Sequence, residues 1–356
     1  MHNGISLYLG LDNPFSENIA LLNLAHKYHI KRVFTSLHIP ETNVITLQNE
    51  LQEILYLAQS YDMEVISDVS PNTLKLLNLP ALDPDKLHRL GIDTIRLDFG
   101  YSPEEIAHLS HSQLKMQFNA STITADFLHK LQAYDTDFTH IDALHNFYPR
   151  EGTGLAISTF KRQNKLLRKY NIPVGAFIPS YNRPRSPMNK GLPTLECHRY
   201  QKADFAMRHL ALLGVNSIFI GDSLPTEKEI KTLSEISADF ITLKAKCLTH
   251  DKFIQNLLVS TIFTARIDAA KTAIRTQESR NLCKSHQINP EYIASRKIGA
   301  ITIDNLNYAR YMGELQIITQ EQNCDHKVNT IAQIIDSDLT LLDFIQPNSK
   351  FKIELI

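Results

Sequence analysis

The chain has 356 residues, of which 43% are apolar, 21% are charged and 8% are aromatic. At roughly 150 residues per domain, this length predicts about two domains. The 37 Lys and Arg residues nearly balance the 38 Asp and Glu residues, which argues against a nucleic-acid or membrane-surface binder, since such proteins normally carry a basic excess. Twelve Gly and fifteen Pro without a low-complexity run exclude a disordered or collagen-like chain.

The ends of the chain and its cysteines predict a compartment. Residues 1–10 lack the basic and apolar regions of a secretory signal, and no apolar run approaches the ~20 residues of a membrane helix. The four cysteines are far apart and form no CxxC pair, which is typical of free thiols in a reducing environment. We therefore expect a cytoplasmic protein.

In the first two thirds of the chain, short β-branched runs alternate with longer amphipathic stretches. The predicted strands cover residues 5–9, 32–37, 64–68, 94–98, 115–119, 138–143, 174–178 and 217–221. The clearest helix runs from Asn43 to about Ser60, with Leu47, Leu51 and Ile54 at helical spacing. Eight such units joined by right-handed crossovers predict an α/β fold, a (β/α)₈ TIM barrel. An open doubly wound sheet is the rival, but no GxGxxG follows the first strand.

The pattern changes at about Ala238, where long helical stretches become rare. Short strands are predicted at 241–245, 300–304, 315–319, 329–334 and 351–355. We therefore predict a TIM-barrel catalytic domain over residues 1–237 and a small β-rich domain over residues 238–356.

The active site of such a barrel lies at the C-terminal ends of its strands. Polar residues at these ends are our candidates, namely Ser6, His38, Glu41, Asp68, Arg96, Asp98, Asn119, His145, Asn146 and Asp222. Their four carboxylates would face one barrel mouth, and paired carboxylates are what glycoside hydrolysis uses. Taken singly, a carboxylate in such a place is more often a helix cap or a salt-bridge partner than a catalytic group.

The loops after the sixth and seventh strands are rich in arginine. They carry Arg150, Arg183, Arg185 and Arg199, together with Glu196. Guanidinium groups match the oxygens of phosphates and carboxylates. Arg150 also precedes Gly152, Thr153 and Gly154 at a predicted helix start, where backbone N–H groups favour an anion. There is no HExxH and no paired Cys, so we expect neither a metal nor a cofactor.

As an ordered set, the motifs resemble those of the 6-phospho-N-acetylmuramidase (MupG) family, formerly labelled outer surface proteins. In the barrel they are GISLYLG, FTSLHIPE, SDVSP, LGIDTIRLDFGYSPEEIA, FNAST, HNFYPREGTGL, GAFIPS and GLPTLECHR. Beyond it follow RIDAAKTAIRTQESR, ITIDNLNYARYMGELQI and VNTIAQII. The resemblance covers nearly the whole chain.

This resemblance implies a TIM barrel followed by a small cyclophilin-like β-barrel domain. It also implies a cytoplasmic, exo-acting glycosidase of peptidoglycan recycling. Such an enzyme separates N-acetylmuramic acid 6-phosphate from N-acetylglucosamine in a phosphorylated amino-sugar disaccharide. We accordingly expect a small-molecule substrate, neither nucleic acid nor membrane as a partner, and leave a homo-oligomer open.

Within this framework, Asp98 is our leading catalytic carboxylate, with Asp68, Glu41 or Asp222 as its partner. The N-acetyl group of the substrate is an alternative nucleophile, as in substrate-assisted hydrolases. The expected substrate-binding residues are Ser6, His38, Arg96, Asn119, His145, Asn146, Arg150, Arg183, Glu196, Arg199 and, from the C-terminal domain, Arg310. Among them, Arg150, Arg183 and Arg199 are the candidates for the phosphate or the lactyl carboxylate.

Two alternatives come from other classes. Another TIM-barrel sugar-phosphate enzyme, such as an epimerase, isomerase or aldolase, would share the fold, but a Schiff-base aldolase needs a lysine at a strand end. Lys115 begins a strand instead. A non-catalytic carbohydrate-binding protein is the second alternative, and the many carboxylates at strand ends argue against it.

Overall fold

The computed structural model describes residues 1–36, 44–68, 74, 77, 79–97 and 101–356. The chain divides into two compact units. The first comprises Met1–Leu210 and Gly214–Ile236, and the second comprises Ala211–Leu213 and Ser237–Ile356.

The first unit is a closed barrel of eight parallel strands, which confirms the predicted TIM-like architecture. The strands are β1 (Gly4–Leu7), β2 (Arg32–Thr35), β3 (Glu64–Asp68), β4 (Thr94–Leu97), β5 (Lys115–Asn119), β6 (Ile141–Leu144), β7 (Val174–Ile178) and β8 (Ser217–Ile220). Each strand pairs with the next, and Gly4 of β1 lies opposite Phe219 of β8, which closes the ring. The bounds of β3, β5 and β7 are those that the sequence predicts.

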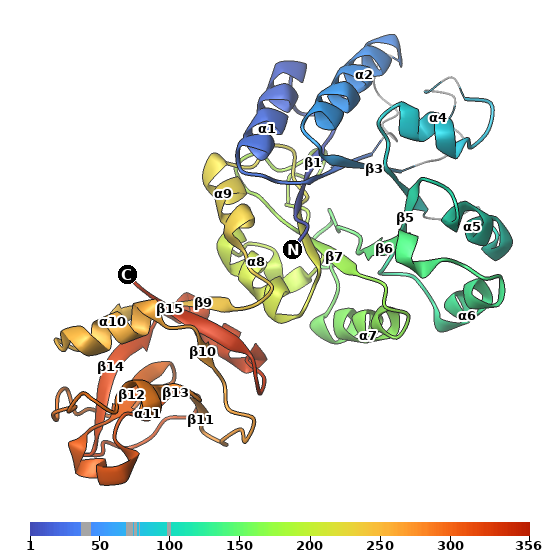
Figure 1. Cartoon of the computed structure of the whole chain (residues 1–356). Helices are drawn as coiled ribbons and strands as arrows, with labels where there is room; N and C mark the ends of the chain where they lie inside the picture. The colour runs from blue at the N-terminus through green and yellow to red at the C-terminus, as the bar shows by residue number, and fades with distance from the viewer. Residues whose placement is uncertain (37–43, 69–73, 75–76, 78, 98–100) are drawn as a thin grey trace. The chain divides into compact units, whose positions relative to one another are not determined.

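Helices lie outside this ring of strands (Figure 1). They are α1 (Phe15–Lys27), α2 (Val44–Ser60), α4 (Pro84–Arg89), α5 (Pro103–Ser110), α6 (Ala125–Ala133), α7 (Ile157–Arg168), α8 (Ala203–Leu212) and α9 (Glu227–Glu235). Several begin at a side-chain cap that the sequence supplies. Ser102 with Glu105 and Thr226 with Glu229 each form a capping box.

One predicted strand begins later than expected. Phe138–His140 forms a 3₁₀ turn, η1, and β6 begins at Ile141. The side chain of Asp137 accepts a hydrogen bond from the backbone N–H of Thr139 at 2.9 Å, so a local cap competes with the extended conformation at these residues.

The interior of the barrel is filled in layers, because alternate side chains of each strand point inward. At the N-terminal end, Arg32 bridges Glu64 at 3.0 Å and Asp142 at 2.7 Å. Lys115 also approaches Glu64 at this end, at 3.6 Å. A buried apolar layer follows, made of Tyr8, Phe34, Ile66, Leu144, Phe177, Leu192 and Phe219. The inward residues beyond this layer therefore form the barrel mouth.

The second unit is built on a curled seven-stranded sheet in the order β10-β15-β9-β14-β12-β13-β11. Its strands are β9 (Ile241–Cys247), β10 (Phe263–Thr264), β11 (Ala273–Arg275), β12 (Ala300–Asp304), β13 (Leu315–Ile318), β14 (Val328–Ile334) and β15 (Lys350–Leu355). Its helices are α10 (Lys252–Ser260), α11 (Ser279–Leu282), η3 (Leu306–Tyr311) and η4 (Asp336–Phe344). The strands β10 and β11 were not predicted, since two or three residues show no period. The cyclophilin-like description stays a prediction.

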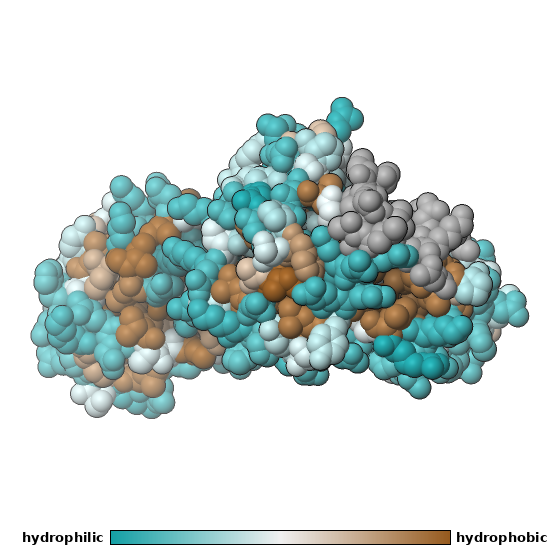
Figure 2. Space-filling model, turned by 90° about the horizontal axis from the view of Figure 1, so that it is seen from above, coloured by the Kyte–Doolittle hydropathy of each residue, from teal (hydrophilic) through white to brown (hydrophobic). Residues whose placement is uncertain are grey.

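Among the described helices, none combines the length and the apolar character that crossing a membrane requires. On the face drawn in Figure 2, apolar patches are separated by polar side chains.

Candidate active site

Arg96 is the central side chain of the barrel mouth. It comes from β4 and is buried, and it reaches across two neighbouring strands. Its Nη1 donates to the backbone carbonyl of Leu144 at 3.1 Å, and its Nη2 donates to Oδ1 of Asn146 at 2.6 Å. The guanidinium also lies 5.9 Å from the ring centroid of Phe34. Arg96 is therefore held from several sides in one orientation.

Asp68 faces Arg96 from the end of β3. Its Oδ1 lies 3.6 Å from Nε of Arg96, and its side chain is 15% exposed. The carboxylate and the guanidinium therefore form an ion pair within the mouth. Both residues are candidates from the sequence, and the structure brings them together because positions 68 and 96 both point into the barrel.

His145 and Asn146 are neighbours in sequence but face opposite sides of β6. His145 is buried against α7, where its Nε2 lies 2.8 Å from Oδ1 of Asn164. Its Nδ1 lies 3.1 Å from Oγ of Ser121, and that hydroxyl accepts the backbone N–H of Asn146 at 3.0 Å. Burial lowers the pKa of His145 to about 4, so the ring is neutral at neutral pH. The structure thus places His145 behind the mouth, where it supports Asn146 through Ser121.

Asp222 follows β8 and is completely buried. One carboxylate oxygen accepts the backbone N–H groups of Ser180 at 2.8 Å and Leu192 at 3.0 Å. The other accepts the N–H of Arg185 at 2.9 Å. Burial raises the pKa of Asp222 to about 6, although these hydrogen bonds oppose the rise. Both oxygens hold the loop after β7, and neither is open to the mouth.

Glu196 and Arg199 form a clamp within the loop that precedes α8. Arg199 is buried, and its Nε and Nη2 contact the two oxygens of Glu196 at 2.7 and 2.9 Å. The same carboxylate accepts the N–H groups of Gly152 at 2.9 Å and Gly154 at 2.7 Å. The bond to Arg199 is the main reason that the pKa of Glu196 falls to about 2.

This clamp changes the interpretation of the Gly152–Gly154 segment. The sequence predicts an anion site there, and the anion that the structure shows is the carboxylate of Glu196. The segment also precedes α7, which begins only at Ile157. Arg199 in turn directs its remaining N–H groups at the backbone carbonyls of Tyr148, Arg150, Lys190 and Gly191. Its donors are thus engaged within the protein.

The other two arginines proposed for anion binding differ in their surroundings. Arg183 pairs with Glu17 of α1, and its Nη1 lies 3.3 Å from Oδ1 of Asn13. Arg150 is exposed, and its carbonyl accepts a hydrogen bond from Arg199. Neither guanidinium is brought to Asp68 by a contact among the described residues.

Among the four loop arginines, Arg185 is the one whose guanidinium lies against aromatic rings next to the buried apolar layer. Its guanidinium carbon lies 4.7 Å from the ring centroid of Tyr8 and 4.8 Å from that of Phe147. Its Nε is buried and has no hydrogen-bond partner within the described part of the chain. From the sequence, Arg185 is one of the four loop arginines, but Arg150, Arg183 and Arg199 were the predicted anion-binding residues. The prolines at 184 and 187, which stiffen this loop, were a usable signal.

The remaining candidates of the mouth lie on β1 and β5. Ser6 is buried and lies against the hydroxyl of Tyr8. The Oδ1 of Asn119 accepts the N–H of Ser121 at 3.1 Å. Asn119 also lines a pocket of about 280 Å³ at the ends of β4 and β5, together with apolar side chains that include Tyr101 and Phe127.

Three candidates, His38, Glu41 and Asp98, lie outside the described residues. Arg310 belongs to the second unit. There it lies on η3, with its guanidinium carbon 4.9 Å from the ring centroid of Tyr311.

Within the described part of the chain, one group of side chains has ligand atoms close enough to hold a metal ion. It consists of Cys197, His198 and His209, whose potential ligand atoms all lie within 4.8 Å of one another. His198 Nε2 lies 2.9 Å from His209 Nδ1. Burial lowers the pKa of His198 to about 3 and that of His209 to about 4, so both rings are neutral at neutral pH. We assign this group no step in the reaction.

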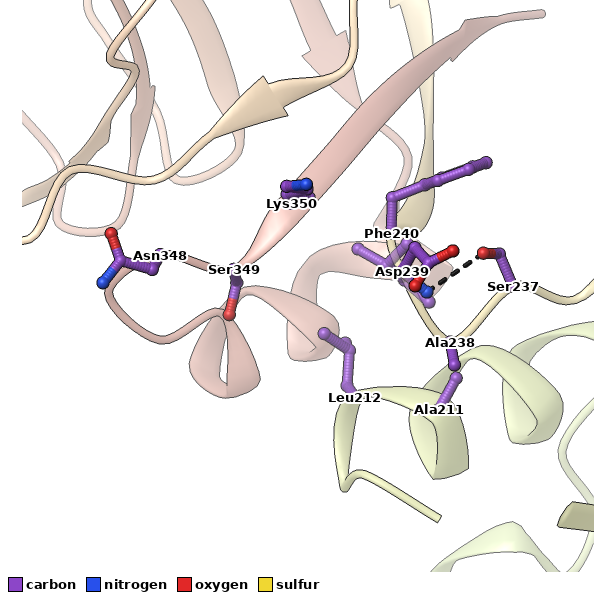
Figure 3. A pocket seen from close by; sticks show the side chains of 10 residues that line it. Ala211, Leu212, Ser237, Ala238, Asp239, Phe240, Asn348, Ser349 and Lys350 are labelled. Atoms are coloured by element: carbon purple, nitrogen blue, oxygen red, sulfur yellow. Dashed lines mark hydrogen bonds between the residues drawn. The ribbon is translucent and has the colours of Figure 1, made fainter. Parts of the chain in front are cut away.

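A pocket of about 410 Å³ occurs in the second unit (Figure 3). Its described lining holds a single carboxylate, Asp239, and a single cation, Lys350. It therefore lacks the pair of carboxylates that glycoside hydrolysis needs, and the barrel mouth is the better candidate for the active site.

Comparison with known families decides the class of this site. A model described as 6-phospho-N-acetylmuramidase, N-terminal, matches residues 3–235, and its C-terminal counterpart matches residues 241–354. The chain belongs to the 6-phospho-N-acetylmuramidase family. It is accordingly a glycoside hydrolase that acts on a small sugar substrate.

Two solved structures share the whole architecture. An uncharacterized B. cereus protein is 27% identical with a TM-score of 0.87, over 99% of this chain and 100% of that chain. A conserved Enterococcus faecalis protein with an unknown function is 30% identical with a TM-score of 0.72, over 100% of this chain and 96% of that chain. None of the curated proteins compared with the chain matches it. Family membership sets aside the aldolase, epimerase and non-catalytic alternatives.

Proposed function

We propose that this enzyme hydrolyses the bond between N-acetylmuramic acid 6-phosphate and N-acetylglucosamine. It would do so from the end of the substrate, in the cytoplasm, as a step of peptidoglycan recycling. The observation that carries the proposal is the Asp68–Arg96 pair in the mouth of a barrel whose chain matches both halves of the family.

In this proposal Asp68 works as an ionised carboxylate. Arg96 lies 3.6 Å away and stabilises the negative charge, which suits a nucleophile, a base or a group that orients the substrate's own N-acetyl oxygen. The proton for the leaving oxygen must then come from a second carboxyl group. Asp98 and Glu41 are our candidates for that acid.

Asp222 has a different role in this scheme. A carboxyl group with a raised pKa is often a general acid, but this one is buried and each oxygen accepts backbone N–H groups. We assign Asp222 to holding the loop after β7 in place.

The test uses two disaccharides that differ only in the 6-phosphate. We expect the enzyme to release N-acetylglucosamine from the phosphorylated muramyl disaccharide alone. Asp68→Asn should lower kcat by roughly 10²-fold or more, because a charge in contact with the reacting centre is lost. Asp126→Asn is a matched control, since Asp126 is an exposed carboxylate on α6 that pairs with Lys130.

Release from neither disaccharide would refute the proposed substrate. Wild-type turnover by Asp68→Asn would remove Asp68 from the mechanism and leave the substrate standing. Asp98→Asn and Glu41→Gln then identify the acid by the same measurement, because loss of the acid is relieved by a substrate with a leaving group that needs no protonation.

A further inference from the structure

We propose that Arg185 binds an anionic oxygen group of the sugar, either its phosphate or its lactyl carboxylate. This inference rests on the proposed function, because it assigns the anion-binding residue of the same site. Arg185 lies on the loop after β7, and hydrogen bonds to the backbone hold this loop in place at Arg185 and Ser186.

Two buried or half-buried carboxylates hold the backbone of this loop. Asp222 accepts the N–H of Arg185 at 2.9 Å, and Asp12 accepts the N–H of Ser186 at 3.0 Å. Asp12 also accepts the hydroxyl of Ser223 at 2.8 Å, which ties the loop to the end of β8. Two successive N–H groups are therefore bound, and the side chain of Arg185 leaves the loop from a fixed point.

Tyr8 and Phe147 then orient the guanidinium. Its carbon lies 4.7 and 4.8 Å from their ring centroids, and the two rings are 6.5 Å apart at an angle of 87°. The hydroxyl of Tyr8 donates to the carbonyl of Gly221 at 2.7 Å, which fixes that ring. Aromatic faces attract a cation but satisfy none of its N–H donors.

The aromatic rings thus orient the N–H groups of Arg185 without accepting hydrogen bonds from them. Its Nε is buried with no hydrogen-bond partner among the described residues, and leaving such a donor unpaired is costly. Asp12 and Asp222 lie near enough to act on its charge, yet the oxygens described above accept backbone N–H groups. A planar guanidinium with open donors matches the oxygens of a phosphate or a carboxylate.

The structure also explains why the neighbouring arginines are poorer candidates. Arg199 is bound to Glu196 and to backbone carbonyls, and Arg183 is paired with Glu17. Arg199 can bind an anion only by losing protein partners, and the charge of Arg183 is already paired with Glu17. Arg185 pays no such cost.

The experiment compares three sugars by isothermal titration calorimetry. N-acetylmuramic acid 6-phosphate carries both anionic groups, N-acetylglucosamine 6-phosphate carries only the phosphate, and N-acetylmuramic acid carries only the lactyl carboxylate. Arg185→Gln should weaken the binding of the doubly charged sugar by roughly 10- to 100-fold, the loss expected for charge-assisted hydrogen bonds. The same loss with only one of the other two sugars identifies which group Arg185 binds.

Two further variants keep the result interpretable. Arg185→Lys keeps the charge and should bind the affected sugar with intermediate affinity, because an ammonium cannot reproduce the planar fork. Arg162→Gln removes an exposed arginine of α7 and should bind all three sugars like the wild type. Circular dichroism checks that each variant is folded, and Arg185→Lys replaces Arg185→Gln if the latter does not fold.

The role of Arg185 and the proposed function are refuted by different outcomes. If the wild type binds none of the three sugars, the role of Arg185 is refuted, and release from the phosphorylated disaccharide decides the proposed function separately. If the wild type binds them and the Arg185 variants bind them equally well, only the role of Arg185 is refuted.

Discussion

The substitution Asp222→Asn tests how the buried carboxylate behaves, and its outcome depends on pH. Burial raises the pKa of Asp222 from 3.8 to about 6. The raised value means that the protonated form is favoured in the folded protein. Protonation of Asp222 therefore stabilises the folded protein: this contribution is complete below pH 3.8 and is lost as the pH rises through about 6. Above that value, ionised Asp222 costs about 3 kcal/mol of folding free energy.

Asparagine has no such charge, but it has one acceptor oxygen fewer. Asp222 accepts three backbone N–H groups, from Ser180, Leu192 and Arg185. The amide NH₂ of Asn cannot accept, so at least one N–H group loses its partner at a cost of about 1–3 kcal/mol. We therefore expect Asp222→Asn to be less stable than the wild type at about pH 4. At about pH 8 it should be equally stable or up to about 2 kcal/mol more stable.

Urea unfolding followed by circular dichroism measures both proteins across this pH range. The difference in unfolding free energy should change by about 3 kcal/mol, mostly between about pH 4 and pH 6. Asp126→Asn, on the exposed face of α6, controls for general charge effects. A difference between wild type and Asp222→Asn that stays constant with pH would show that burial does not govern this carboxyl group.

Three further predictions concern the same mouth. Arg96→Lys should lower kcat by roughly 10-fold or more, since an ammonium cannot hold Asn146 and Asp68 together; unchanged kcat in steady-state assays would contradict this. Ser121→Ala should lower the unfolding free energy by about 1–3 kcal/mol in urea titrations, because the buried ring of His145 loses a hydrogen-bond partner. An equally stable variant would refute the supporting role of Ser121. The pKa of Glu196 is lowered to about 2, so its stabilisation is present above about pH 4.5 and is lost as the pH falls through about 2. After allowance for the 32% exposure of its side chain, Glu196→Gln should cost about 1–2 kcal/mol at neutral pH; a cost that did not shrink in acid would contradict the assignment.

Much of the barrel follows from local sequence pattern. The run at residues 115–119 is apolar at alternate positions, Met116 and Phe118, and lies between helical stretches, and it forms β5 at the expected bounds. The same period of two predicts that Asp68 and Arg96 point to one side of the sheet. A closed barrel makes that side a common interior, so the proximity of these two residues was predictable.

The role of His145 shows where pattern reading was incomplete. His145 precedes an inward-facing residue and therefore points outward, to Asn164 and Ser121. His145 was a binding candidate because it is polar and follows a strand, whichever side of the strand it faces. Strict alternation would have placed it behind the mouth.

The arginines required information that no local pattern contains. Whether a guanidinium is open to a ligand depends on which carboxylate lies beside it in space, and these partners come from distant parts of the chain. Glu17 of α1 pairs with Arg183, while Glu196 both binds Arg199 and occupies the Gly152–Gly154 segment. By itself, the sequence determined the barrel, the inward positions of its strands and the sugar-hydrolase family. Only the tertiary structure decided which cation is available to a substrate, because that depends on long-range pairing and on the aromatic rings that surround Arg185.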